Sequence, residues 1–371
     1  MPLFHTRRRE YVPLATSPTS AEPLKRPKRR YLFLAAFLLL IITSFAFNVF
    51  FLVRAHTRNW TNPLDNYQGL NHQPLLDVSV STRVSNTSAH AVVTTLYDDT
   101  FAPAVATLGH SLQQVNTSAR LIVLYLPSQV SPRALCIATA SGFEPHPVER
   151  IAPPHDGQGV YIHFLDQFTK LRLWTLDQVG IQSLVYLDAD TLVKKNFDEL
   201  FGLPFNFAAV PDVFYNYRGY TLAFNAGMLF VRPSSALFTR MLKQLPYARF
   251  PPVDAEQSFL NHYFGIEAVR LPYAYNANLA IKRRTPEVWQ GGWDEFRVVH
   301  FTLVKPFLGK RYAAVRWDDL EAHVRKVAGW EGGRFRNETM WWGETFKGMK
   351  KVRERELSRC WMLDEKIGTR T

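Results

Sequence analysis

The stretch LVYLDADTLV, residues 184–193, decides the fold: it is an apolar run interrupted by two aspartates. The part before Asp188 is short and apolar, which predicts a buried β-strand. Side chains two residues apart on an extended chain point the same way, so Asp188 and Asp190 can face one point in space. Two converging carboxylates repel each other unless a cation lies between them, and such ligands suit Mg²⁺ or Mn²⁺. An isolated Asp-x-Asp triplet more often marks a turn, so other segments must decide between these interpretations.

The chain before this stretch alternates between strand and helix patterns. The apolar periodicity predicts strands at 91–97 and 120–126, and helices at 101–114, from 131 onward and at 164–179, the last of them amphipathic. Ser131 followed by Pro132 is typical of a helix start. Such alternation predicts an α/β fold, with a mostly parallel sheet, helices on both faces and ligands at the carboxyl ends of strands. Asp188 and Asp190 lie at one such end, and the sequence has no P-loop signature.

The composition predicts a large core and an uneven charge. The 371 residues are 47% hydrophobic and 14% aromatic. Half of the net charge of +12 lies in residues 1–30, which hold eight Lys or Arg and two Glu. No zinc-finger, helix-turn-helix or RNA-binding signature accompanies it, so we expect no nucleic-acid partner. The mildly basic remainder fits an anionic substrate and equally a solvated surface.

Residues 31–53 predict a membrane anchor, because these 23 residues carry no charge and can span a bilayer as a helix. A cleaved signal peptide is the less favoured interpretation, since the stretch is too long and no cleavage site follows. The basic cluster before it favours a cytosolic N-terminus and a body in the secretory lumen. Four Asn-x-Ser/Thr triplets, all after the span, agree with this: Asn59, Asn86, Asn116 and Asn337.

These boundaries divide the chain into five parts. We expect a cytosolic basic tail at 1–30, a signal anchor at 31–53, a stem at 54–88, a folded body at 89–308 and a helical extension at 309–371. Five tryptophans of the extension could pack, bind an acceptor or lie against the membrane, and packing is the default. Cys136 and Cys360 leave two possibilities open, one disulfide or two buried thiols.

Five segments in the expected order resemble glycosyltransferase family 8, the glycogenin-like nucleotide-sugar transferases. They are TTLYDDTFAPAVATLGHSL (94–112), FTKLRLWTL (168–176), LVYLDADTLVKKNFDELF (184–201), FNAGMLFVRPS (224–234) with DAEQSFLNHYF (254–264), and VHFTLVKPF (299–307). The resemblance implies that 89–308 is a catalytic domain, with a Rossmann-like nucleotide-binding fold of the glycosyltransferase A type. It also implies retention of anomeric configuration, Mn²⁺ (or Mg²⁺) as the metal, and a UDP-sugar donor.

The resemblance further implies a metal site and two cationic contacts. Asp188, Asp190 and His300 match the metal ligands, and an imidazole beside two carboxylates suits Mn²⁺. Lys305 matches a lysine that meets the diphosphate, and Lys170 matches one near the donor sugar; both would stabilise the charge of departing UDP. Without the motif, His300 would be interpreted as a buried strand histidine and the two lysines as solvated charges.

Other matches concern the donor sugar and the base. Asn225 matches a position that contacts the sugar, and Gly227 would let the backbone approach closely. Asp254 and Gln257 match positions near the reaction centre, so with Lys170 they form the predicted catalytic set. The predicted nucleotide site is completed by Ala189, between the two aspartates, and by Leu96 and Phe101, where the family grips uracil. Packing is the alternative role for Leu96 and Phe101.

The chain also departs from the family pattern. Glu256 stands where the family usually has Asp, and its longer side chain shifts the reach of its carboxylate by one methylene. Residues 302–304 replace a longer, glycine-containing stretch, and only Tyr161 or His163 lies near the position of a family arginine. These departures motivate an alternative, a catalytically silent, membrane-anchored binding module. A phosphohydrolase with Asp188 as nucleophile is a third possibility, but no second acidic cluster has matching spacing.

The favoured interpretation is a single-pass, Golgi-type enzyme with a lumenal catalytic domain. It would move N-acetylglucosamine, glucose or galactose from UDP to a glycan or glycoprotein acceptor. Retention permits a double displacement or a same-side attack, and we prefer same-side attack because no nucleophilic carboxylate pair is evident beside the metal aspartates. Asp254 and Gln257 would then orient the donor.

Overall fold

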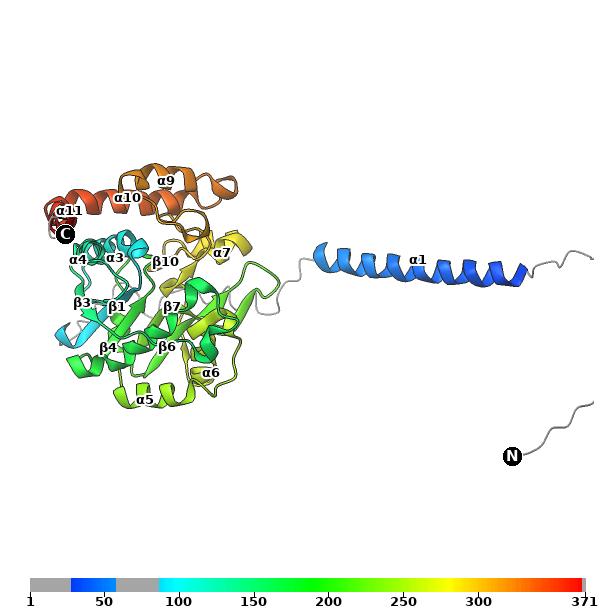
Figure 1. Ribbon diagram of the computed structural model, residues 1–371, viewed down its shortest axis with the longest axis horizontal. Helices are drawn as coiled ribbons and strands as arrows, with labels where there is room; N and C mark the ends of the chain where they lie inside the picture. Colours follow the sequence, from blue (N-terminus) through cyan, green and yellow to red (C-terminus); the bar gives the residue numbers. More distant parts are fainter. Residues whose placement is uncertain (1–27, 58–86, 369–371) are drawn as a thin grey trace, which may run out of the picture. The chain divides into compact units, whose positions relative to one another are not determined.

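The computed structural model describes residues 28–57 and 87–368 (Figure 1). The chain divides into two units, Met1–Trp60 and Thr61–Thr371. Nearly all of the predicted cytosolic tail and most of the predicted stem lie outside the described residues. The first unit contains α1, Lys28–Thr57, and the second contains both sheets and all other described helices.

The first unit is the helix predicted from the uncharged stretch. Its segment Tyr31–Arg54 is long and apolar enough to cross a bilayer, and none of its side chains is buried. The helix prediction is therefore confirmed, and its sequence is consistent with a membrane anchor.

The second unit is built on a seven-stranded mixed sheet of order β3-β2-β1-β4-β7-β6-β8. Strands β3 to β4 along this order are parallel, β7 is antiparallel to both neighbours, and β6 pairs with β8 in parallel. A three-stranded sheet of order β5-β10-β9 lies beside it in the fold. The strand bounds are β1 His90–Leu96, β2 Arg120–Tyr125, β3 Glu144–Pro147, β4 Ser183–Leu187, β5 Thr191–Val193, β6 Phe207–Val213, β7 Tyr220–Val231, β8 Val269–Arg270, β9 Ala277–Asn278 and β10 Val298–His300.

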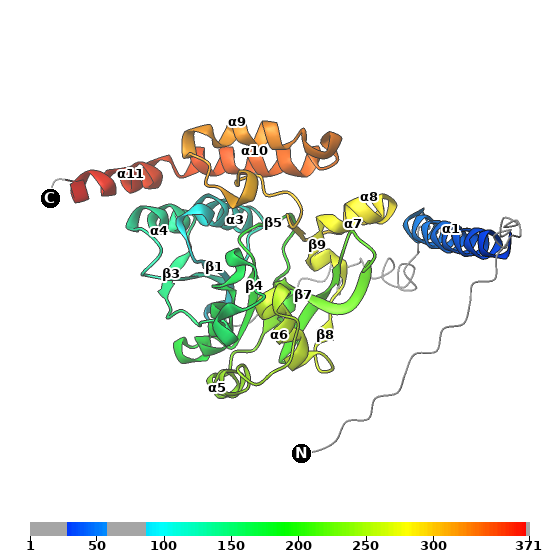
Figure 2. The ribbon, with the colours of Figure 1, turned by 45° about the vertical axis from the view of Figure 1, so that its right-hand side comes forward.

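Helices cover both faces of the large sheet, as the alternating pattern predicts (Figure 2). Beside α1, the α-helices are α3 Ala102–Gln114, α4 Pro132–Thr139, α5 Ser235–Gln244, α6 Ala255–Phe264, α7 Leu279–Arg284, α8 Pro286–Gly292, α9 Leu320–Val327, α10 Arg336–Val352 and α11 Glu354–Gly368. The 3₁₀ helices are Thr87–Ala89, Asp99–Phe101, Pro154–Gly157, Ile162–Phe164, Gln167–Val179, Asp198–Gly202, Pro252–Asp254, Tyr273–Tyr275, Lys310–Tyr312, Trp317–Asp319 and Trp330–Gly333. The predicted start of α4 is confirmed, since the Ser131 side chain accepts a hydrogen bond from Ala134 N.

One predicted helix has a different geometry. Residues 164–179 were expected to form an amphipathic helix, and 167–179 are helical but of the 3₁₀ type. Phe168, Leu171 and Trp174 are fully buried and stand three residues apart, which is the period of a 3₁₀ helix. The segment ends at Gly180, whose φ of 84° is left-handed.

Two apolar cores fill the space on either side of the large sheet. Alternate residues of β1 enter each core, Val92 and Leu96 on one side and Ala91 and Val93 on the other. The first core continues under α3, α4 and the C-terminal helices, and the second lies under α5, α6 and the 3₁₀ helix 167–179. The central parallel strands β1, β2 and β4 are therefore buried on both faces.

The C-terminal extension is helical, as predicted, and closes one side of the first core. Helix α10 packs on α3, α11 packs on α4, and α9 packs on α10 (Figure 1). Trp342 is fully buried, and the other four tryptophans are partly buried against the same core. A disulfide joins Cys136 of α4 to Cys360 of α11, which decides between the two possibilities left open by the sequence.

Candidate active site

The acidic cluster is assembled by the ends of three strands. Asp188 follows β4, and its backbone N donates to the carbonyl of Gly227 on β7 at 2.8 Å. Asp190 precedes β5, and Thr191 of β5 pairs with His300 of β10. Phe301 N donates to the Asp190 carbonyl at 2.9 Å, which fixes the turn between the two sheets. Segments more than 100 residues apart in sequence therefore bring His300 to the aspartates.

The three predicted metal ligands converge in a geometry that fits a divalent ion. Their ligand atoms lie within 4.8 Å of one another. His300 Nε2 is 3.2 Å from Asp190 Oδ1 and 3.9 Å from Asp188 Oδ2. Two carboxylate oxygens and one imidazole form a donor set suited to Mn²⁺, and Zn²⁺ more often takes additional His or Cys ligands.

A chain of amides sets the orientation of the His300 ring. His300 Nδ1 lies 3.0 Å from Asn276 Oδ1, and Asn276 Nδ2 donates to Asn225 Oδ1 at 3.0 Å. Asn225 Nδ2 in turn donates to Asp212 Oδ1 at 3.2 Å. Because Asn276 uses its NH₂ group on Asn225, its oxygen must accept from His300 Nδ1–H. With the proton of a neutral ring on Nδ1, the Nε2 lone pair is directed at the aspartates, as a metal ligand requires.

In each aspartate, one carboxylate oxygen contacts a lysine and the other faces His300. Asp188 Oδ1 accepts from Tyr186 Oη at 2.5 Å and lies 3.1 Å from Lys170 Nζ, so Oδ2 remains on the His300 side. Asp190 Oδ2 pairs with Lys305, and its Oδ1 faces His300. Burial alone would raise the pKa of Asp190, but Lys305 and His300 more than offset it and hold that pKa well below its usual value.

Lys170 is a fully enclosed cation. Its side chain is 2% exposed, and Nζ donates to Glu256 Oε1 at 2.6 Å and to the Ala226 carbonyl at 3.2 Å. Burial disfavours its charged form, but Asp188 and Glu256 raise its pKa above the ordinary value, so it stays protonated. The alternative of a solvated charge is therefore wrong for Lys170. Glu256, which stands where the family usually has Asp, therefore forms an ion pair with Lys170.

Gly227 has a different role from the one predicted. A Cβ built there would lie 2.1 Å from His300 Cε1 and 2.7 Å from His300 Nδ1. Gly227 does not line the cavity described below, so its lack of a side chain makes room for the His300 ring. Gly227 was expected to let the backbone approach the donor. The packing instead explains this glycine by the position of the His300 ring.

Asp212 is a site residue that the sequence analysis missed. It is 4% exposed, and its carboxylate accepts from Gln257 Nε2 at 3.0 Å and from Val213 N at 2.8 Å, besides Asn225. Burial raises its pKa to about 6, against the lowering effect of these hydrogen bonds. The sequence did offer a signal for Asp212, namely an acid inside the apolar strand 207–213. Burying a carboxylate costs free energy unless it has hydrogen-bond partners, so such a residue indicates a polar cluster.

One cavity of about 390 Å³ unites most predicted residues. Ten of the predicted site residues line it: Phe101, Lys170, Asp188, Ala189, Asp190, Asn225, Asp254, Gln257, His300 and Lys305. Gln257 also accepts from Ala226 N at 2.9 Å, which ties α6 to β7 at the cavity wall. Two predicted residues, Leu96 and Gly227, are not part of the lining.

The side chain of Leu96 lies on the wrong face of β1 for nucleotide contact. It is fully buried in the first core, whereas Thr95 and Tyr97 line the cavity. Neighbouring residues of a strand point to opposite faces, so a one-residue error in assigning the contact reverses the side. Phe101 does line the cavity, and it also packs edge-on against Phe307 at 5.2 Å between ring centroids.

Where the family arginine has no match, a stack of rings borders the cavity. His163 stacks on Tyr312 with centroids 4.3 Å apart and on Tyr161 at 5.6 Å. His163 and Tyr312 line the cavity from two segments far apart in sequence. Burial, with help from Lys305, lowers the pKa of His163, so this ring is neutral at physiological pH.

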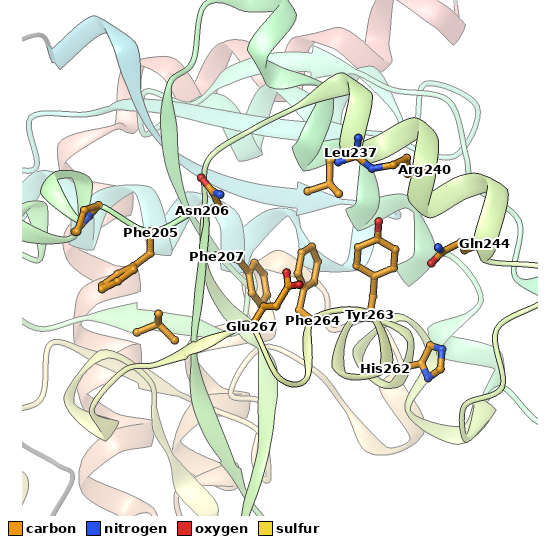
Figure 3. Close-up of a pocket in the computed structure, with 12 residues that line it drawn as sticks. Phe205, Asn206, Phe207, Leu237, Arg240, Gln244, His262, Tyr263, Phe264 and Glu267 are labelled. Carbon is orange, nitrogen blue, oxygen red and sulfur yellow. The ribbon is translucent and has the colours of Figure 1, made fainter.

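A second cavity, of about 680 Å³, lies near the opposite ends of the strands (Figure 3). Asn206, Phe207, Tyr263 and Glu267 are among its lining residues. Phe207 is level with Leu184 through β7, so this cavity lies by the start of β4, whereas Asp188 follows its end. None of the predicted site residues lines it, and ligands of such sheets bind at the carboxyl ends of strands.

A Rossmann-like mixed sheet with an Asp-x-Asp turn at a strand end defines a glycosyltransferase of the A type, a class that generally uses a nucleotide-sugar donor and a divalent metal. The sequence model of glycosyl transferase family 8 matches residues 92–309, more than half of the chain. The chain therefore belongs to glycosyl transferase family 8, which confirms the resemblance and the fold class.

Three curated relatives illustrate the range of proteins that the chain is similar to. Galactinol synthase 1 of Solanum lycopersicum is 29% identical over 228 residues, which cover 56% of this chain and 70% of that protein. Glycogenin of Neurospora crassa is 28% identical, over 56% of this chain and 29% of that protein. Inositol phosphorylceramide glucuronosyltransferase 1 of Arabidopsis thaliana is 28% identical, over 65% of this chain and 41% of that protein.

Proposed function

We propose that this protein is a metal-dependent, retaining glycosyltransferase that moves a sugar from a UDP-sugar to a glycan or glycoprotein acceptor. The observation that carries the proposal is the convergence of Asp188, Asp190 and His300 with the buried Lys170 and the partly buried Lys305 in one cavity of a family 8 fold. Such a cavity concentrates charge that matches a nucleotide diphosphate and its counter-ion.

Asp188, Asp190 and His300 would hold Mn²⁺, or Mg²⁺, through the oxygens and the Nε2 that face one another. The ion would supply positive charge to the diphosphate and so stabilise UDP as it leaves. Lys305 would exchange its contact with Asp190 for a diphosphate oxygen, because it lies at the same cavity wall. Lys170 would stay fixed by Glu256 and Asp188 and add a preorganised charge near the donor sugar.

The donor sugar would lie against the amide cluster. Asn225 and Gln257 line the cavity and are each held by Asp212, so both side chains are oriented before a donor arrives. Asp254 would contact the sugar or the acceptor from the rim. Phe101, with Tyr97 beside it, would hold the base, and Ala189 would leave room for the nucleotide between the aspartates.

For the chemical step we propose same-side attack, in which the departing UDP oxygen takes the proton of the acceptor hydroxyl. The bond between the anomeric carbon and UDP breaks as the bond to the acceptor oxygen forms. Glu256 is a carboxylate of the cavity lining that is not a predicted metal ligand, but it is engaged by Lys170 at 2.6 Å. A carboxylate held by a buried cation is a weak nucleophile, which favours this step over a covalent intermediate.

The placement in the cell follows from the N-terminal helix. We propose a single-pass anchor at 31–53, a cytosolic tail, a stem at 54–88 and a lumenal catalytic domain at 89–308 in the Golgi or another secretory membrane. The apolar helix and the disulfide support this, because disulfides persist in oxidising compartments.

The test measures UDP release by the full-length chain in detergent with UDP-glucose, UDP-galactose, UDP-N-acetylglucosamine and UDP-glucuronic acid, in Mn²⁺ or EDTA. The last donor is included because one relative is named a glucuronosyltransferase. We expect release from at least one donor, lost in EDTA and reduced at least about 100-fold by Asp188→Asn. Arg240→Ala, in the second cavity, serves as the matched control and should behave as the wild type.

One competing function has its own support. A silent binding module is favoured by the fact that both aspartates already have a lysine partner, which substitutes for a metal charge. Tight Mn²⁺-independent binding of UDP without any UDP release from the four donors would favour the silent module and contradict the enzyme.

A further inference from the structure

The hairpin between β6 and β7, residues 213–222, has unusually exposed apolar side chains. Tyr217 is 89% exposed, Leu222 is 58% exposed and Tyr215 is 50% exposed. The pairing of β6 with β7 shifts register twice before the hairpin, between Ala209 and Val213. Such irregularities bend a strand and direct its end away from the sheet. The ring of Tyr217 is therefore available to a partner from outside.

The base of this hairpin is held in place by the segment that begins with α7. Arg284 donates to the Asn216 carbonyl at 2.9 Å, and the Tyr220 hydroxyl bonds to Thr285. Arg283 stands over the Tyr215 ring, with its guanidinium carbon 4.3 Å from the centroid. Contacts of this kind restrict the loop, so a ligand that binds Tyr217 would pay little entropy for ordering it.

The hairpin also reaches the rim of the cavity of about 390 Å³ that contains Asp188 and Asp190, called the acidic cavity below. Arg218 forms an ion pair with Asp254 at 3.5 Å, and Asp254 lines the cavity. Tyr217 is the neighbouring residue and does not line the cavity itself. The exposed ring thus belongs to the residue next to the one that contacts the cavity rim.

We infer that the β6–β7 hairpin is the outer part of the acceptor site, and that Tyr217 stacks on the second sugar of an acceptor glycan. This rests on the proposed function. A cavity of about 390 Å³ is of the size that one small ligand such as a nucleotide sugar fills, so a longer acceptor must lie across the rim. An exposed tyrosine gives a flat apolar face with a polar tip, which suits the C–H face and hydroxyls of a sugar.

The inference defines the acceptor as a glycan of at least two sugar units. A single sugar or a small polyol would occupy the cavity mouth near Asp254 and would not reach Tyr217. An unglycosylated peptide is the main alternative occupant of an exposed aromatic hairpin, and the experiment separates the two.

The experiment compares the full-length wild type with Tyr217→Ala, using the donor and metal found in the donor assay. The acceptors are methyl glycosides of glucose, galactose, N-acetylglucosamine and xylose, and disaccharides made from the same sugars. For the active disaccharide we expect kcat/KM to fall about tenfold through KM, while kcat/KM for the monosaccharide and donor hydrolysis stay unchanged. Tyr217→Phe should retain the disaccharide preference, because it keeps the ring.

Tyr247→Ala is the matched control, since Tyr247 is 85% exposed and does not line the cavity. Equal losses for mono- and disaccharide, no loss for either, or a lowered melting temperature that explains the loss would overturn the inference. A loss confined to an unglycosylated peptide acceptor would also overturn it. If the wild type releases no UDP from any donor, the proposed function itself fails, whereas the other outcomes concern the hairpin alone.

Discussion

The acidic cavity and the C-terminal extension differ in the side chains that they bury: charged residues in the first and aromatic residues in the second. The cavity is lined by Lys170, Asp190 and Glu256, all nearly inaccessible to water, and Asp212 is buried behind two of its lining residues. The extension contributes stacked aromatic rings and a disulfide, and Trp342 lies nearly parallel to Phe346 with centroids 5.5 Å apart. A buried charge destabilises the folded state unless it is paired, whereas buried aromatic side chains stabilise it. The first region is therefore organised for chemistry and the second for stability.

This contrast predicts that substitutions in the two regions have separable effects. Changes in the cavity should lower turnover with modest changes in melting temperature. Changes in the extension should lower the melting temperature while the active molecules keep their turnover. Each of the following predictions would weaken the contrast if the two effects appeared together.

The largest effect is expected from Gly227→Ala. The new methyl group would collide with the His300 ring, 2.1 Å away, and the ring would have to move from its place beside Asp190. A displacement of about 1 Å at a reacting site can cost about 100-fold in rate, so we expect that loss in kcat/KM for the donor. Gly202→Ala is the control, because a Cβ there meets nothing within 4 Å. Wild-type donor kinetics in Gly227→Ala would contradict the placement of His300.

The disulfide should give the converse result. Cys136 and Cys360 are 224 residues apart in sequence, and their link holds α11 against α4. We expect Cys360→Ser to lower the free energy of unfolding by about 2–5 kcal/mol, since long loops closed by a disulfide lose the most chain entropy. Turnover per folded molecule should stay within about twofold of the wild type. Thermal unfolding and donor hydrolysis measure the two quantities, and Cys136→Ser should reproduce both.

Asp212 gives a smaller, pH-dependent effect. Burial raises its pKa to about 6 in the folded chain from the ordinary value of 3.8, so the folded state binds the proton more tightly. Stability from this group is therefore fully present below about pH 4 and declines as the pH rises through 6, by about 3 kcal/mol in total. Asp212→Asn should remove this slope between pH 4 and 6, measured by thermal unfolding in detergent. An unchanged slope in the variant would mean that Asp212 is not the titrating group.

Sequence patterns predicted the central part of the site because its geometry is local. Asp188 and Asp190 stand two residues apart in the short turn between β4 and β5, and this turn makes the side chains converge. The family pattern added His300 and Lys305, which the small sheet brings from more than 100 residues away. All four of these residues line the same cavity as Lys170.

The errors arose where tertiary context decides. Leu96 was assigned to the nucleotide although its two neighbours, Thr95 and Tyr97, line the cavity, and only the packing of the two cores shows this. Gly227 was explained by the donor although the His300 ring is what excludes a side chain. Asp212 was missed because its function is expressed through Asn225 and Gln257, which no local spacing reveals.

The order in which the two cysteines are synthesised has a consequence for biogenesis. Cys136 leaves the ribosome long before Cys360, so its thiol stays unsatisfied until almost all of the second unit has emerged. A nascent chain interrupted before α11 would expose a reactive thiol to folding enzymes, and a finished one would not. The covalent bond can thus form only after α11 has been synthesised.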